Sequence, residues 1–543
     1  MKSVESRQKI EILDTTLRDG AQAEGVSFSV RDKLAVVAVL DALGIPLIEA
    51  GNPGSNPKDS AFFASASERK LTHASLVAFG ATCRPGFRPE DDPQLVSLAE
   101  AGTGTVTLFG KAWRLHIAEV LRTTEEENER MIRDSVAWLV SRGKRVIFDA
   151  EHFFYGWNDD REVAVRMAAA AAEAGASVVC LCETNGGAFP EDVFEATRAV
   201  IDRIGGKCAV GIHAHDDSGL AVANTLAAVR GGATHVQGTL AGFGERCGNA
   251  NLATVLGNLQ LKLGYACIPA DKMRLLTTSV RHIAAIANVV LPGGLPYVGR
   301  RAFAHKGGMH TDGVRKVAGS FEHVTPESVG NSRRFLVSEQ AGKSAVIDRI
   351  RAVVPEIGRD DPSVEAVLKR LKELELDGYQ FEGADGSFEL LIRKTVLPYE
   401  PFFYLERFRI LGEITIVPAR SVSTSAMVKI GASGQTEITA AEGDGPVNAL
   451  DNALRKALER FYPRLSGMKL TDYKVRVLDA VAATAAKVRV LIESTDGHRI
   501  WNTVGVSTDI IEASWIALVD SVENKLIHDM LESESGGEGL VAK

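Results

Sequence analysis

The chain has 543 residues and a formal net charge of −8, with 45% hydrophobic and 24% charged residues. This length exceeds one ordinary domain, and the balanced composition excludes a fully disordered chain. The acidic balance excludes a broad basic surface, so we expect no nucleic-acid partner.

The amino-terminal residues are too polar for a signal peptide, and no apolar run reaches the ~18 residues that span a bilayer. Six cysteines in so long a chain do not suggest a disulfide framework. We therefore expect a cytoplasmic protein that has no contact with a membrane.

The first half of the chain alternates short apolar runs with longer amphipathic ones. The predicted strands are Lys9–Leu13, Pro46–Ala50, Ser75–Phe79, Thr105–Phe109, Arg145–Asp149, Ser177–Cys182, Cys208–His213 and Thr234–Thr239. The predicted helices are Arg31–Leu43, Pro57–Ser67, Asp91–Ala101, Thr124–Arg142, Asp159–Ala174, Pro190–Ile204, Gly219–Arg230 and Leu252–Leu263. Eight strand-then-helix units in roughly 260 residues predict an α/β fold, a (β/α)8 TIM barrel. A doubly wound open sheet is the alternative.

The pattern changes after the barrel. Helices and loops dominate the next stretch, which includes a charged helix from Ser363 to Leu376. Beyond Pro398, strand-like and helical runs follow one another twice, about 60 residues apart, and such a repeat suggests a pseudo-symmetric α+β domain. We predict four parts: a catalytic barrel (1–265), a helical linker subdomain (266–397), a C-terminal α+β domain (398–532) and a disordered tail (533–543).

Polar residues cluster directly after the predicted strands. Because the carboxyl ends of all barrel strands meet at one face, these residues are expected to share one site. They are Arg18 and Asp19 after the first strand, Glu49 at the second, Glu151 after the fifth, Glu183 and Thr184 after the sixth, His213 and His215 at the seventh, and Glu245 and Asn249 after the eighth.

The pair His213 and His215 suggests a metal site, because residues i and i+2 of a strand point to the same face. Asp19 is the natural third ligand, since the first and seventh strands are close around a barrel, and Asn249 could add a neutral oxygen. Two histidines and one carboxylate suit Zn, Mn or Fe(II). The alternatives are histidines that satisfy ordinary polar contacts and an Arg18–Asp19 salt bridge beside a turn.

Three motifs together resemble the family of 2-isopropylmalate, homocitrate and citramalate synthases. They are Asp14-Thr-Thr-Leu-Arg-Asp-Gly-Ala-Gln22, His213-x-His215 and Gly244-Glu-Arg-x-Gly-Asn-Ala250. The resemblance implies a TIM barrel that condenses acetyl-CoA with a 2-oxo acid, an acyltransferase whose acyl group becomes an alkyl group on transfer.

The resemblance continues over nearly the whole chain. Ala302–Ser344, with Leu336-Val-Ser-Glu-Gln-Ala-Gly-Lys343, is similar to the connecting subdomain. Gly443–Leu450 is similar to the regulatory domain, which in relatives binds an end-product amino acid. This implies an allosteric homodimer with isoleucine or leucine as effector.

Several stretches are most similar to the longer type of citramalate synthase, which implies pyruvate as acceptor and a role in isoleucine biosynthesis. They are Gly25–Ser29, Pro53–Asp59, Phe109–Trp113, Asp149–Phe154 and Thr184–Gly187. A 2-isopropylmalate or homocitrate synthase using another 2-oxo acid, or an acyl-CoA lyase, stays open. A pocket for 2-oxoglutarate needs an extra cation, for which Lys111 and Arg84 are candidates.

The resemblance assigns roles to matching residues of this chain. Arg18 polarises the acceptor carbonyl, and Thr184 holds the carboxylate of the 2-oxo acid. A divalent metal ion, Zn, Mn or Mg, is implied, with ligands at Asp19, His213, His215 and Asn249.

Glu151 and His310 are the remaining catalytic residues that the resemblance implies. Glu151 lies in the catalytic network, and His310 belongs to the base system that deprotonates acetyl-CoA. One departure concerns this base: relatives often carry a tyrosine about ten residues after His310, where this chain has Phe321, with His323 nearby.

Overall fold

The computed structural model describes residues 8–66, 69–305, 308–335, 343–358, 360–381, 383–414, 422–478, 486–497 and 499–537. The chain divides into two compact units. The first contains the chain up to Ala304 and Val314–Arg334, and the second contains His305–Gly313 and the chain from Phe335 onward. The boundaries predicted at residues 265, 397 and 532 divide the chain more finely and stay predictions.

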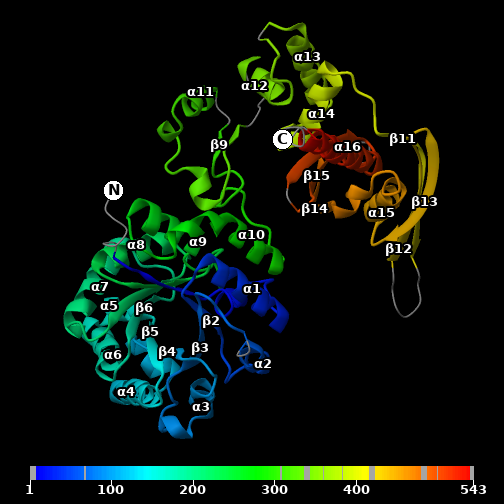
Figure 1. Cartoon of the computed structure of the whole chain (residues 1–543). Helices are drawn as coiled ribbons and strands as arrows, with labels where there is room; N and C mark the ends of the chain where they lie inside the picture. Colours follow the sequence, from blue (N-terminus) through cyan, green and yellow to red (C-terminus); the bar gives the residue numbers. More distant parts are fainter. Residues whose placement is uncertain are drawn as a thin grey trace, which may run out of the picture. The chain divides into compact units, whose positions relative to one another are not determined.

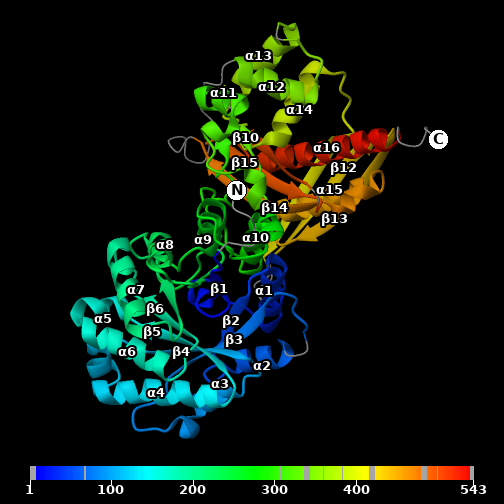
Figure 2. The same cartoon turned by 60° about the vertical axis from the view of Figure 1, so that its left-hand side comes forward.

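Eight parallel strands form a closed barrel in the first unit, in which β1 pairs with both β2 and β8 (Figures 1 and 2). The closure confirms the predicted (β/α)8 barrel, and the open-sheet alternative is wrong. The strands are β1 (Glu11–Asp14), β2 (Leu47–Gly51), β3 (Ser75–Ala81), β4 (Thr105–Lys111), β5 (Arg145–Glu151), β6 (Val178–Glu183), β7 (Ala209–Ala214) and β8 (His235–Gly238).

Helices follow the strands and surround the barrel (Figure 1). They are α1 (Val30–Leu43), α2 (Pro57–Ala66), α3 (Pro93–Ala99), α4 (Glu125–Ser141), α5 (Phe153–Asp159), α6 (Arg161–Glu173), α7 (Pro190–Ile204), α8 (Ala221–Gly231) and α9 (Leu252–Leu256). The single helix predicted over Asp159–Ala174 is wrong at its start. Asp160 separates α5 from α6 and caps α6, because its side chain accepts backbone N–H bonds from Glu162 and Val163.

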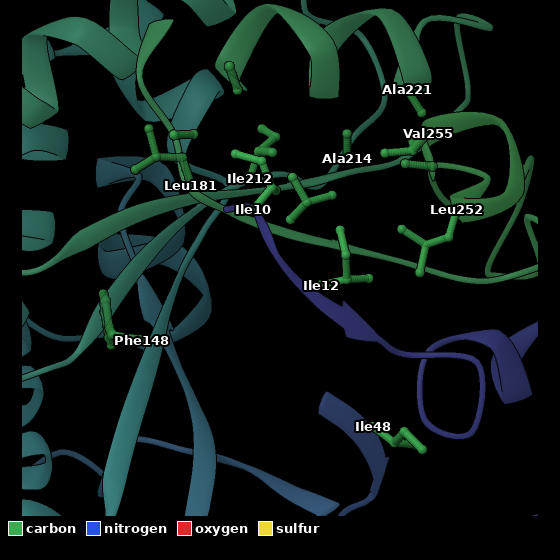
Figure 3. Packing of buried hydrophobic residues seen from close by; sticks show 14 of the residues in the cluster. Ile10, Ile12, Ile48, Phe148, Leu181, Ile212, Ala214, Ala221, Leu252 and Val255 are labelled. Atoms are coloured by element: carbon green, nitrogen blue, oxygen red, sulfur yellow. The ribbon is translucent and has the colours of Figure 1, made fainter. Parts of the chain in front are cut away.

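Side chains of alternate strand residues point to opposite faces of the barrel wall. Outward residues such as Ile12, Ile48 and Phe148 pack with the helices into one core, part of which Figure 3 shows. Their neighbours in sequence form a smaller apolar layer, which we place inside the barrel: Leu13, Leu47, Val77, Ile147, Val178 and Cys180. The polar residues near the carboxyl ends of the strands therefore lie next to this apolar layer of the barrel interior.

Shorter elements follow the barrel. They are α10 (Leu276–Ile286), β9 (Ala304–His305), α11 (Gly308–Lys316) and β10 (Arg334–Phe335). The quoted motif Leu336–Lys343 lies almost entirely outside the described residues.

The second unit combines three helices with a repeated three-strand-and-helix motif. The helices are α12 (Lys343–Val353), α13 (Pro362–Leu376) and α14 (Asp385–Val396). The repeats are β11 (Phe403–Ile414), β12 (Val422–Ala432), β13 (Gln435–Gly443) and α15 (Pro446–Leu458), then β14 (Lys469–Val477), β15 (Val488–Thr495), β16 (Ile500–Ser507) and α16 (Ile510–Gly537). Each repeat has its own antiparallel sheet, which supports the predicted pseudo-symmetric α+β arrangement.

The carboxyl-terminal helix is longer than the sequence predicts. Because α16 runs to Gly537, residues 533–537 of the predicted disordered tail are helical, and residues 538–543 lie outside the described residues. Among the helices that the structure describes, none combines the length and apolar character needed to cross a bilayer.

A charged cluster lies at the amino-terminal end of the barrel strands. Arg145 donates two hydrogen bonds to the Glu11 carboxylate, at 2.9 and 2.7 Å, and His235 Nδ1 lies 3.0 Å from Glu11 Oε2. Burial raises the pKa of Glu11, but His235 and Arg145 outweigh burial and lower that pKa from 4.5 to about 2. The ionised carboxylate therefore stabilises the folded state.

Replacing Glu11 by Gln is expected to lower the free energy of unfolding at neutral pH. A depressed carboxyl pKa stabilises the fold above the unfolded value of 4.5, and that stabilisation is lost as the pH falls toward about 2. The difference between wild type and variant should therefore shrink over this window in denaturant titrations. Glu195→Gln is the control, because the exposed Arg161–Glu195 pair should contribute under ~1 kcal/mol. A difference that is constant with pH would contradict the assignment.

Candidate active site at the carboxyl ends of the barrel strands

A cavity of about 250 Å³ opens where the strands end. It combines charged groups with aromatic walls, as small-molecule sites do. Its lining residues are Arg18, Asp19, Gln22, Phe79, Phe109, Asp149, Glu151, Cys182, Thr184, His213, His215 and Glu245. Side chains that are far apart in the sequence thus face one space, as the barrel topology predicts.

Three possible metal ligands converge in this cavity. Asp19 Oδ2 lies 3.1 Å from His213 Nε2 and 3.7 Å from His215 Nε2. The two Nε2 atoms are 3.2 Å apart. All three side chains are buried, and one atom from each lies within 4.8 Å of the others. Two imidazoles and a carboxylate at this spacing fit a divalent ion.

Asn249 borders the three donors. Its Nδ2 donates to Asp19 Oδ2 at 2.7 Å and lies 3.3 Å from His213 Nε2. Its Oδ1 is buried and has no hydrogen-bond partner among the described residues. Gly244 makes this position possible, since a Cβ there would lie 1.9 Å from Asn249 Oδ1. A cation between the donors would favour the opposite amide orientation, with the oxygen turned toward it.

Gln237 of β8 orients His213. Its Oε1 lies 2.9 Å from His213 Nδ1, and its Nε2 donates to Asp149 Oδ1 at 2.8 Å. The Asp149 bond fixes the amide with its oxygen toward His213, so Nδ1 carries the imidazole proton. His213 Nε2 then presents its lone pair to the metal position, as ligating histidines require.

The electrostatics of the donors favour a bound cation. Burial raises the pKa of Asp19, but Arg18 and His213 outweigh burial and hold that pKa well below its usual range. Burial lowers the pKa of His215 to about 4. Asp19 is therefore anionic and His215 neutral at physiological pH, the protonation states in which these groups bind metals.

A second trio of possible donors lies deeper, at Asp149, Cys180 and Cys182. Burial raises the pKa of Cys182 to about 11, and it holds the pKa of Cys180 well above its usual value. Because the thiolate is the metal-binding form, these cysteines are poorer ligands than the two histidines.

Arg18 is held beside the metal donors by three contacts. Its Nε donates to Glu49 Oε2 at 2.6 Å, its Nη1 lies 3.3 Å from Asp19 Oδ1, and its Cζ lies 3.9 Å from the centre of the Phe79 ring. Burial lowers the pKa of Arg18, but Asp19 and Glu49 outweigh burial and raise that pKa above its usual value. The Arg18–Asp19 salt bridge, which the sequence analysis gave as an alternative to a metal site, is present. It helps to hold the positive charge of Arg18 in the cavity.

Thr184 and Glu151 line the side of the cavity made by β5 and β6. Thr184 Oγ1 accepts the backbone N–H of His152 at 2.9 Å, which leaves the hydroxyl proton available to a ligand. His152 adopts the left-handed backbone region, with φ at 59°. Glu151 pairs with Lys111, so its carboxylate is already partly neutralised.

His310 is the one predicted site residue that lies outside the first unit. It is exposed on α11 within the second unit, and its role stays a prediction. His323 does not line this cavity, and its ring packs against Tyr297 and Phe303 at centroid distances of 5.0 and 6.3 Å. Phe321 is 46% exposed.

A second cavity, of about 290 Å³, adjoins the first and shares Arg18, Gln22 and Phe79 with it. Its other polar walls include Asn52, Lys58 and a buried Lys33–Asp59 ion pair of 2.6 Å. The side chain of Arg18 therefore contributes to the walls of both cavities.

Sequence reasoning missed Gln237, Asp149, Phe79 and Phe109. Asp149 precedes Glu151 by two positions on β5, so strand alternation alone places it on the inner face. No sequence pattern indicated Gln237, because its role depends on the contact of its side chain with His213 Nδ1.

Family models match three successive parts of the chain. Residues 9–290 match the model described as HMGL-like. Residues 297–378 match the homocitrate synthase post-HMGL domain-like model, and residues 382–526 match the LeuA allosteric (dimerisation) domain.

Proteins of several organisms are similar to this chain over almost its full length. An (R)-citramalate synthase of Aquifex aeolicus (strain VF5) is 49% identical, covering 96% of this chain and 98% of that protein. An (R)-citramalate synthase of Synechocystis sp. is 48% identical, covering 94% and 95%. A probable 2-isopropylmalate synthase of Methanopyrus kandleri is 31% identical, covering 95% and 98%.

Replacing Gln237 by Met is expected to weaken binding of a divalent metal by roughly 10- to 100-fold, because His213 loses the partner that fixes its tautomer. Competition with a chromophoric chelator measures the affinity. Gln260→Met is the matched control, since Gln260 is also buried but accepts backbone N–H bonds of Cys267 and Ile268 instead. Equal affinity in Gln237→Met and wild type would show that Gln237 does not orient a ligand.

Proposed function

The chain belongs to the HMGL-like family and, within it, to the 2-isopropylmalate, homocitrate and citramalate synthases, and we propose that it condenses acetyl-CoA with pyruvate. The reaction gives citramalate and free CoA, and we assign it to isoleucine biosynthesis. The observation that carries the proposal is the placement of Arg18 next to the Asp19–His213–His215 donors in one cavity.

The enzyme depends on a divalent metal ion, for which Zn, Mn and Mg are the candidates. Asp19, His213 and His215 would hold it, with Asn249 beside them, and the buried, unpartnered Asn249 Oδ1 supports this set. When bound, such an ion supplies Lewis acidity that stabilises the negative charge developing on the acceptor oxygen.

Arg18 donates to the carbonyl oxygen of pyruvate. Because Glu49 and Phe79 hold the guanidinium before substrate arrives, little reorganisation is needed when charge develops on that oxygen. Thr184 donates its hydroxyl proton to the carboxylate of pyruvate, since its oxygen is already engaged with the His152 N–H. The two groups together orient the acceptor carbonyl for attack.

A base removes a proton from the methyl group of acetyl-CoA, and the resulting carbanion attacks the carbonyl carbon of pyruvate. We assign His310 to the base system that deprotonates acetyl-CoA, and Glu151 to the catalytic network of the barrel. The carbon–carbon bond forms as the carbonyl oxygen takes up a proton. Water then cleaves the thioester, which releases CoA and the second carboxylate of citramalate.

The adjoining cavity suits acetyl-CoA. It meets the first cavity at Arg18, and Lys58, Asn52 and Ser55 offer polar contacts to a thioester ligand that carries phosphate groups. A substrate there would present its acetyl group toward the acceptor, as bond formation between two bound substrates requires.

Pyruvate fits better than larger 2-oxo acids. The stacked rings of Phe79 and Phe109, with centroids 5.2 Å apart, occupy the space beside Arg18. The cation that a 2-oxoglutarate pocket needs is also lacking at the predicted positions, because Lys111 pairs with Glu151 and Arg84 Nε lies 3.1 Å from Asp92 Oδ2.

We further propose that the chain forms a homodimer and that an end-product amino acid, isoleucine or leucine, inhibits it. The match of residues 382–526 to an allosteric dimerisation domain supports both points. A rate that falls as isoleucine or leucine is added, together with a dimer mass by light scattering, is the expected result.

The function is tested by the release of free thiol from acetyl-CoA with a divalent metal and one of four acceptors: pyruvate, 2-oxobutyrate, 2-oxoisovalerate or 2-oxoglutarate. Fast release with pyruvate, and citramalate as the product, is expected. Release only with 2-oxoisovalerate would make the chain a 2-isopropylmalate synthase. Cleavage of an acyl-CoA without condensation would make it a lyase.

Replacing Arg18 by Ala is expected to lower kcat/KM by roughly 10²–10³-fold, because a preorganised donor to the developing oxyanion is lost. The chelator assay should show metal affinity close to that of wild type, since Arg18 is not a ligand. Arg84→Ala, on a neighbouring loop, should leave turnover unchanged. Wild-type turnover in Arg18→Ala would remove Arg18 from the mechanism.

Replacing Phe109 by Ala is expected to enlarge the acceptor pocket. The ratio of kcat/KM for 2-oxobutyrate to kcat/KM for pyruvate should rise by about 10-fold or more. One methylene group in an apolar pocket typically changes the discrimination between two substrates by at least this factor. Phe87→Ala serves as the control, because Phe87 is 38% exposed and does not line the cavity. An unchanged ratio would mean that other groups set the acceptor size.

A further inference from the structure

The loops after β6, β7 and β8 each carry a residue of the candidate active site, namely Thr184, His215 and Asn249. Backbone contacts join these loops to one another. His215 pairs with Asn249 in an isolated antiparallel bridge, and the N–H of His215 donates to Glu183 O, at the end of β6, at 3.1 Å. The relative position of the three loops therefore decides how these side chains meet in the cavity.

Arg246, on the loop after β8, connects all three loops through one guanidinium group. Its Nε donates to Asp217 Oδ1 at 2.8 Å, and its Nη2 donates to Asp217 Oδ2 at 2.9 Å. The same Nη2 donates to Thr184 O at 2.7 Å. Asp217 follows His215 by two positions on the loop after β7. Because the guanidinium is planar and its donors form a rigid fork, such a contact fixes orientation as well as distance.

The backbone adopts unusual conformations where these contacts form. Arg246 lies in the left-handed region with φ at 55°, which residues that carry a Cβ seldom adopt. Gly186, two positions after Thr184, has φ at 70°, and a Cβ there would lie 2.2 Å from Asp217 Oδ2. Residues in the left-handed region persist where their surroundings hold them, and they concentrate at functional sites. The conformation of Arg246 therefore points to a role in the neighbouring site.

Arg246 acts on the cavity from outside it. It does not line the cavity, and its side chain is 42% exposed, so the ion pair with Asp217 should contribute little to the stability of the whole fold. Thr184 does line the cavity. Its carbonyl oxygen accepts from Arg246, and its hydroxyl oxygen accepts the N–H of His152 at 2.9 Å. These two contacts restrain both the main chain and the side chain of Thr184.

We propose that Arg246 is a positioning residue for the acceptor, because it holds Thr184 where the hydroxyl group can donate to the carboxylate of the 2-oxo acid. The inference rests on the proposed function, from which it takes the role of Thr184. A hydrogen bond to that carboxylate is made in the bound substrate and in the transition state alike, so its loss raises the KM for the acceptor and leaves kcat little changed. The cavity assigned to acetyl-CoA contains neither Thr184 nor Arg246 in its walls.

Arg246→Met is expected to raise the KM for the acceptor, pyruvate in the proposed reaction, by roughly 10-fold, as the loss of a hydrogen bond to a charged group does. The values of kcat, of KM for acetyl-CoA and of metal affinity in the chelator assay should stay close to those of wild type. Arg246→Lys should give an intermediate KM, because an ammonium group has no planar fork with which to reach Asp217 and Thr184 together.

Arg133→Met is the matched control. Arg133 is 37% exposed and also contacts two groups with one guanidinium, since its Nη2 lies 2.9 Å from Glu129 Oε1 and 2.7 Å from Glu173 Oε2. These residues belong to α4 and α6 on the outside of the barrel, so the KM for the acceptor should equal that of wild type. Melting temperatures check that the variants are folded, and Arg246→Lys takes the place of Arg246→Met below if the latter does not fold.

A double-mutant cycle separates positioning from a general loosening of the loops. Thr184→Val removes the hydroxyl group, keeps the branched shape and should itself raise the KM for the acceptor. If Arg246 acts through this hydroxyl, Arg246→Met should add little in the Thr184→Val background, whereas independent effects would multiply. An unchanged KM in Arg246→Met, or effects that multiply, would overturn the positioning role while wild-type turnover upholds the proposed function. A wild type that turns over none of the four acceptors would overturn the proposed function, and this inference with it.

Discussion

Closure of the barrel is the constraint on which the rest of the structure depends. The pairing of β1 with β8 joins the two ends of a segment of more than two hundred residues, through contacts such as Glu11 with His235 and Asp14 with Gly238. Because β7 pairs with β8 in turn, Asp19 comes to lie beside His213 and His215. The candidate metal ligands from the first and seventh strand ends are brought together by the closure of the barrel.

Several buried carboxylates gather at the carboxyl ends of the barrel strands. Burial raises the pKa values of Asp14 and Asp149 to about 7. Arg18 lies between Asp19 and Glu49, which are both buried as well. Buried carboxylates in such number are costly unless cations balance them, and a bound divalent ion adds the missing positive charge. Functional sites commonly bury charged groups in this way, whereas the rest of a protein core excludes them.

Much of the fold could be predicted because strand and helix periods are local properties of the sequence. All eight barrel strands were predicted to within two or three residues, and the Asp19, His213 and His215 positions followed from strand ends. The predicted helix Asp159–Ala174 corresponds to α6, whereas the short helix α5 before it was missed. β11, β13, β14 and β16 of the second unit were missed, and of these β13 and β14 are half-exposed strands without a continuous apolar run. Gln237 and the Phe79–Phe109 pair act through distances that no sequence pattern encodes, and the place of His310 in the chemistry stays a prediction.

The central claim is that two imidazoles and a carboxylate from the strand ends form the metal centre. X-ray absorption at the zinc edge, on the full chain loaded with one zinc ion, tests it most directly. The expected spectrum shows two imidazole nitrogens and oxygen ligands at about 2.0–2.2 Å. Sulfur scattering at about 2.3 Å would instead place the ion at Cys180 and Cys182 and contradict the claim, as would a spectrum without imidazole ligands.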